Sequence, residues 1–175
     1  MPMELSDLQA AAKYSTLDIV KALDIPRERL RDWMVRGFIE PSLPALGKGT
    51  RAGFTRNDVY GIALFRKLVD SGFKRELASE LCKKFMGMEG TFRYYNYVIF
   101  KIVNRFGKRV VSSLNFGGEK RLSMIIDGNE TIFTAGDKGG KVKGIQHKDN
   151  EEWEDILIVN FVKLGKDVDK ALSEL

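Results

Sequence analysis

Basic side chains are concentrated in one window of the chain, and their chemistry is that of phosphate binding. Residues 27–75 contain eleven lysines and arginines against five acidic residues, whereas the whole chain of 175 residues has a net charge of +5. The remainder of the chain is therefore slightly acidic. Because lysine and arginine neutralise phosphates, the window indicates a polyanionic partner, and nucleic acid is the leading candidate.

Residues that could support catalysis or hold a metal are sparse. With one cysteine, Cys82, and one histidine, His147, the chain offers no internal disulfide and disfavours a zinc site. No nucleophile–base pair or pair of carboxylates stands out, so we expect no catalytic residues, no metal, no cofactor and no enzyme activity. The sequence has no run of eighteen apolar residues and no secretory signal. We therefore expect a cytoplasmic protein with no membrane partner.

The elements that position the basic window follow from capping and turn patterns. Ser15 and Thr55 each precede an aspartate by three residues, the capping-box pattern that starts a helix. Pro26 ends one helix and suits the first turn of the next. A glycine-rich, basic loop spans residues 46–54. These patterns predict four helices: residues 15–24, 26–35, 55–71 and 74–85.

The second of these helices has one apolar face and one charged face. Its apolar residues recur at three- and four-residue spacing: Leu30, Trp33 and Met34. Glu28 and Asp32 lie near the centre of the opposite face, with arginines on both flanks. In a major groove such a helix meets phosphates at its flanks and base edges at its centre. Two interpretations of the acids stay open: they accept hydrogen bonds from cytosine amines, or, as we prefer, they form helical ion pairs with Arg31 and Arg36.

Several segments, in this order and spacing, resemble the MerR family of regulators over about 70 residues. The matching segments are the following: Tyr14-Ser15, Leu30-Arg31-Asp32-Trp33, Gly37-Phe38-Ile39-Glu40-Pro41, Gly49-Thr50-Arg51, Phe54, Asp58-Val59 and Leu68-Val69-Asp70-Ser71-Gly72-Phe73. The resemblance implies a winged helix-turn-helix over residues 14–86, preceded by an extension at 1–13. The family usually continues into a long dimer-forming helix, which Gly87 and Gly90 interrupt in this chain.

The resemblance also implies which residues meet DNA. Arg31 of the second helix and Arg51 of the wing, the loop before the third helix, occupy positions that hold phosphates in the family. Trp33 has two open roles, in the core or against the sugar-phosphate backbone. Together with the charge pattern, this predicts a DNA-binding set: Arg27, Arg29, Arg31, Trp33, Arg36, Lys48, Arg51 and Arg56.

Beyond Gly87 the pattern changes to short strands separated by glycine-rich turns. We expect strands over the following ranges: 91–103, 109–116, 120–127, 131–135 and 156–164. A last helix is expected over 166–175. The fold class is thus α+β, with a small, mostly antiparallel sheet domain over 91–175 that serves dimerisation or ligand sensing. A small-molecule effector is not identified by the sequence.

The function that these features favour is a DNA-binding transcriptional regulator, with double-stranded DNA as partner and a homodimer formed through the C-terminal region. Two alternatives remain open. One is an excisionase-like architectural DNA-binding protein. The other is a winged-helix module for protein interaction or ligand sensing that does not bind DNA.

Overall fold

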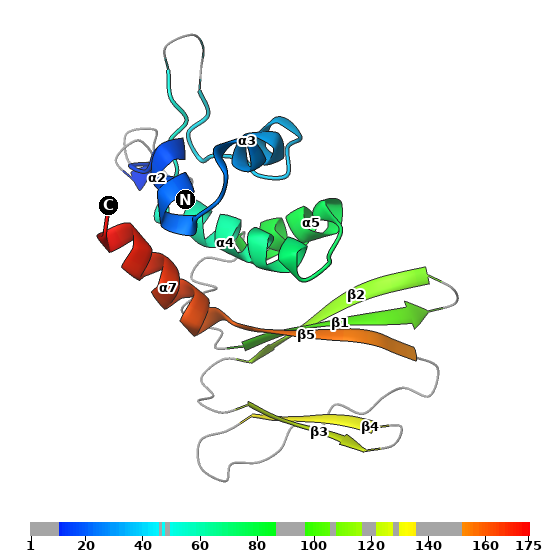
Figure 1. The fold of residues 1–175 in the computed structure, drawn as a ribbon. Helices are drawn as coiled ribbons and strands as arrows, with labels where there is room; N and C mark the ends of the chain where they lie inside the picture. Colours follow the sequence, from blue (N-terminus) through cyan, green and yellow to red (C-terminus); the bar gives the residue numbers. More distant parts are fainter. Residues whose placement is uncertain are drawn as a thin grey trace, which may run out of the picture. The chain divides into compact units, whose positions relative to one another are not determined.

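The chain combines helices in its N-terminal part with strands in its second half, as expected for an α+β protein (Figure 1). The computed structural model describes residues 11–45, 47, 50–86, 97–105, 108–116, 122–127, 130–135 and 152–175. By their internal contacts the residues divide into two units, one of Met1–Thr91 with Leu164–Leu175 and one of Phe92–Lys163. Among the described residues, no helix is both long and apolar enough to cross a membrane.

Four helices lie where the capping and turn patterns predict them: α2 (Thr16–Leu23), α3 (Arg27–Val35), α4 (Arg56–Asp70) and α5 (Arg75–Met86). Both predicted capping boxes are present, at Ser15 before α2 and at Thr55 before α4. Asp24 ends α2 in the left-handed conformation, with φ 46°, which aspartate tolerates better than most residues. The turn between α2 and α3 is therefore short and defined by local chemistry.

The core of this unit is built from the apolar faces of the four helices. Trp33 of α3 and Phe65 of α4 are fully buried, and their rings meet edge to face at 4.9 Å and 76°. The other large side chains with almost no exposed surface are contributed by every helix and by the wing: Ile19, Leu30, Phe54, Ile62, Leu64, Leu68 and Phe85. Burial of each such side chain contributes roughly 1.5–3 kcal/mol, so this core is what holds α3 in place.

The wing lies between α3 and α4 in the chain, and its described residues are 42–45, 47 and 50–54 (Figure 1). Its two arms are joined at the base by paired backbone hydrogen bonds between Leu43 and Gly53, of 3.0 and 2.8 Å. The Asp58 carboxylate, besides capping α4, accepts hydrogen bonds from the backbone N–H (3.1 Å) and the hydroxyl (2.9 Å) of Ser42. One side chain thus anchors the wing to the start of α4.

Gly53 is a position where the fold requires a glycine. A Cβ atom there would lie 2.7 Å from the backbone oxygen of Ala12 and 3.3 Å from Cβ of Leu43. Because a backbone oxygen cannot rotate away, we expect Gly53→Ala to lower the free energy of unfolding by about 1–3 kcal/mol, measured by urea denaturation.

A matched control for this substitution lies in the last helix of the chain. A Cβ added at Gly165 meets nothing within 4 Å, and alanine is the better helix former. Gly165→Ala should therefore raise stability by up to about 1 kcal/mol. Equal effects of the two substitutions would contradict the close approach at Gly53.

The second unit is antiparallel, as the sequence predicts. β1 (Tyr97–Arg105) lies between β2 (Lys108–Phe116) and β5 (Glu152–Asn160), so the strand order is β2-β1-β5. β3 (Leu122–Asp127) and β4 (Glu130–Ala135) form a separate two-stranded sheet. A register shift between Ile102 and Val103 interrupts the pairing of β1 with β5.

The last helix, α7 (Phe161–Ser173), begins five residues earlier than the sequence suggests. Residues 161–164, expected as the end of a strand, are helical. The side chain of Asn160 accepts a hydrogen bond of 2.8 Å from the backbone N–H of Lys163, which is the N-cap interaction that starts a helix. In addition, residues from Leu164 onward group with the N-terminal unit rather than with the strands, whereas the expected domain 91–175 includes the whole helix.

Candidate nucleic-acid interface

Helix α3 buries one face and leaves the opposite face free for a partner. Leu30 and Trp33 have no exposed surface, whereas Glu28, Arg31 and Val35 are exposed. At 100° per residue these three lie along one strip of the helix, opposite the buried pair. The outward strip therefore presents an acid, a base and an aliphatic side chain within two turns.

The arginines around this strip fall into two groups, and the first group is neutralised by acids within the unit. Arg29 lies 2.8 Å from Asp70 and covers the ring of Trp33 at 4.8 Å. Arg36 lies 2.6 Å from Asp32, the helical ion pair that the sequence analysis preferred for this acid. Arg75 of α5 also approaches Asp32, at 3.4 Å. These partly exposed pairs contribute little to stability, but they neutralise the charges of the three arginines.

The second group has no such partner. Arg27 and Arg31 on α3 and Arg51 on the wing are exposed, and none forms an ion pair with another residue of the described part of the chain. The predicted pairing of Glu28 with Arg31 is likewise not among those ion pairs. Arg31 and Arg51, which the family resemblance places at phosphate-holding positions, are thus available cations. Lys48, also predicted, lies outside the described residues.

Arg56, another predicted contact, is held by the last helix. Asp169 of α7 accepts from its guanidinium at 2.5 and 2.7 Å and from the hydroxyl of Tyr60 at 2.5 Å. The hydrogen bond to Asp169 raises the pKa of Arg56, and burial followed by the bond to Asp169 raises the pKa of Tyr60. Asp169 is not among the residues predicted from the sequence, because an acid 113 positions away carries no local pattern.

Of the two roles left open for Trp33, the structure supports the core. The side chain has no exposed surface, so the predicted contact with the DNA backbone is corrected here. Its indole Nε1 is buried without a hydrogen-bond partner. The physical reason for the burial is α4, which places Phe65 against the indole and closes this side of α3.

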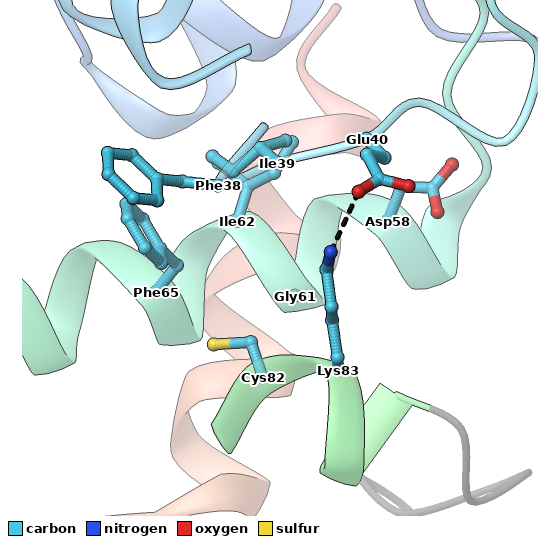
Figure 2. Close-up of a pocket in the computed structure, with 9 residues that line it drawn as sticks. All are labelled: Phe38, Ile39, Glu40, Asp58, Gly61, Ile62, Phe65, Cys82 and Lys83. Atoms are coloured by element: carbon cyan, nitrogen blue, oxygen red, sulfur yellow. Dashed lines mark hydrogen bonds and ion pairs between the residues drawn. The ribbon is translucent and has the colours of Figure 1, made fainter. Parts of the chain in front are cut away.

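A hollow of about 250 Å³ lies between the loop after α3 and helices α4 and α5 (Figure 2). Phe38 and Phe65 stack at 6.1 Å along one side, and an ion pair between Glu40 and Lys83, of 2.7 Å, spans the other. Cys82 also lines the hollow, and burial raises the pKa of its thiol. A thiol that stays protonated is a poor nucleophile, so this lining is structural in character.

The described residues contain no cluster of side chains that could bind a metal ion. They include no group of three or more histidine, cysteine, aspartate or glutamate side chains placed to hold a metal ion. His147 lies outside the described part of the chain. The exposed arginines of α3 and of the wing are charged side chains of this face that are available to a partner.

Comparison with known families gives an independent result for the same region. Residues 14–84 match the family model described as MerR HTH family regulatory protein. This range contains α2, α3, the wing, α4 and most of α5. No curated protein is similar enough to the chain to count as a match.

Proposed function

We propose, from the MerR-type helix-turn-helix that residues 14–84 form, that this DNA-binding regulator places α3 in the major groove and its wing on the phosphate backbone. The single observation that carries the proposal is the division among the arginines. Arg31 and Arg51 are exposed and without an ion-pair partner among the described residues, while Arg29, Arg36 and Arg56 are paired.

The dimensions of α3 support this docking. An α-helix with its side chains is about 10–12 Å across, which matches the width of the major groove, about 12 Å, and the nine residues of α3 run for about 13 Å at 1.5 Å per residue. Arg31 then reaches a phosphate from the helix and Arg51 reaches one from the wing. Arg27, at the edge of the exposed face, adds a third contact, and Lys48 adds attraction from the wing.

The paired arginines have secondary roles in this proposal. Arg29 and Arg36 lie on the flank of α3 toward Asp70 and Asp32, so each contacts DNA only by giving up its acid. Glu28 has no ion pair with Arg31 in the described structure, which favours the interpretation that it accepts a hydrogen bond from a cytosine amine.

For the second unit we propose a role in dimerisation, so that two copies of α3 meet one site. β2 and β5 form the two edges of the three-stranded sheet, and the backbone groups of an edge strand can pair with a second copy. We further propose that the protein acts in the cytoplasm as a regulator without catalytic activity. Its DNA-binding domain comprises residues 14–86 together with the part of α7 that contacts α4.

Selection of bound genomic fragments by the purified full-length chain tests this function. We expect discrete sites with two-fold symmetry, because a symmetric dimer reads two half-sites about one helical turn apart. Fragments scattered without a common sequence would instead indicate an excisionase-like architectural role. If the chain does not bind duplex DNA at low salt, the proposal is rejected. The remaining alternative is then the winged-helix module for protein interaction or ligand sensing.

Asp169 should limit DNA affinity through its hold on Arg56. Asp169→Asn is expected to raise the affinity for random duplex DNA about three- to eight-fold at 0.1 M salt, since it frees one cation next to the wing. The free energy of unfolding should fall by about 0.5–1 kcal/mol. Fluorescence anisotropy with a labelled duplex measures the first quantity and urea denaturation the second.

Glu80→Gln is the matched control for this variant. Glu80 is an exposed acid on α5, and its replacement changes the net charge by the same amount. Equal gains in affinity for the two variants would mean that only net charge matters, and Arg56 would then have no place in the interface.

A further inference from the structure

Val35 is the most exposed of the large hydrophobic side chains in the described part of the chain, at 78%. Single exposed aliphatic residues are common on protein surfaces, so exposure alone argues nothing. The position of this one is what matters. Val35 closes the outward strip of α3, seven residues after Glu28 and four after Arg31, on the side opposite Leu30 and Trp33.

The neighbours of Val35 leave its methyl groups accessible. Arg36, which follows it, is drawn to the flank of the helix by its ion pair with Asp32, at 2.6 Å. Arg75 approaches the same acid from α5. The guanidinium of Arg36 and the carboxylate of Asp32 are therefore directed to one another, and the aliphatic side chain of Val35 is exposed at the end of the strip.

Only one kind of group in the major groove matches such a side chain. Base-pair edges present hydrogen-bond donors and acceptors there, together with one apolar group, the C5 methyl of thymine. A β-branched residue in a helix is held largely in one rotamer, so the methyl groups of Val35 are presented in a defined direction. A valine facing a polar base edge would remove that edge from water without replacing its hydrogen bonds.

We propose that Val35 contacts the C5 methyl group of a thymine and so selects one A·T base pair in each half-site. This inference rests on the proposed docking of α3 in the major groove. It adds to that function a specificity-determining residue, whereas Arg31 and Arg51 supply affinity that does not depend on sequence.

The test removes the C5 methyl group of the thymine and the two γ-methyl groups of Val35 in turn. In a duplex chosen from the selected fragments, each thymine of the half-site is replaced by deoxyuridine, which lacks only the C5 methyl. For the wild-type protein, the replacement at one of these positions should weaken binding about four-fold, which is the effect of burying one methyl-sized group. For Val35→Ala the same replacement should have no effect, while Leu175→Ala, at another exposed aliphatic residue (52%), should behave as wild type.

The possible outcomes distinguish a failure of the Val35 contact from a failure of the proposed docking of α3. If the Arg31→Ala/Arg51→Ala variant loses affinity but Val35→Ala remains as sensitive to deoxyuridine as wild type, the methyl contact is wrong and the docking stands. Selected fragments without any sequence preference would also overturn the contact, because no base pair would then be chosen. If the double arginine variant binds as well as wild type, the proposed docking of α3 is wrong.

Discussion

The double variant Arg31→Ala/Arg51→Ala is expected to bind random duplex DNA about 50- to 100-fold more weakly than wild type at 0.1 M salt, per protomer. Each phosphate contact contributes about 0.9 to the slope of log affinity against log salt, so the slope should fall by about 1.8. The reason is that these two arginines are exposed and unpaired within the described part of the chain. Anisotropy titrations at four or more salt concentrations measure both quantities.

A matched control removes two positive charges elsewhere. Lys84 on α5 and Lys166 on α7 are also exposed, and Lys84→Ala/Lys166→Ala should change the affinity less than three-fold, since only long-range attraction is lost. Neither pair of residues contributes to the core, so all variants should unfold at similar urea concentrations. Identical binding of the double arginine variant and wild type at low salt would show that the DNA surface lies elsewhere.

Replacement of Trp33 should affect stability strongly and DNA contact only through stability. Trp33→Ala empties a fully buried site against Phe65 and is expected to lower the free energy of unfolding by about 3–5 kcal/mol. Trp33→Phe should cost less than about 2 kcal/mol. It keeps an aromatic ring and removes an indole N–H that has no hydrogen-bond partner, and burying an unsatisfied donor is itself unfavourable.

Urea denaturation and DNA titration of both variants distinguish core packing from surface contact. Trp33→Phe should retain wild-type affinity in conditions where it is fully folded. A Trp33→Ala variant that kept its stability within about 1 kcal/mol but lost DNA affinity would contradict the buried position and restore the backbone contact.

The local features of the N-terminal unit could be predicted because each depends on a few neighbouring residues. Ser15 and Thr55 cap their helices through aspartates three positions later. Gly37 and Gly72 follow α3 and α4 with positive φ, of 71° and 90°, as expected for residues that end helices. The existence of the sheet strands followed from the same kind of reasoning, but residues 161–164 were misassigned because strand and helix are both compatible with a short apolar run.

What only the tertiary structure decided was the state of each charge. By charge alone Arg29, Arg31 and Arg56 are equivalent cations, and their different pairing arises from acids 41 and 113 positions away that the fold brings to Arg29 and Arg56. Trp33 was ambiguous for the same reason, since its burial depends on Phe65 of another helix. Hydrophobic spacing and capping act over a few residues and are written in the sequence. The pairing of distant side chains depends on packing, and it is this pairing that neutralises Arg29 and Arg56 while Arg31 and Arg51 stay exposed and unpaired among the described residues.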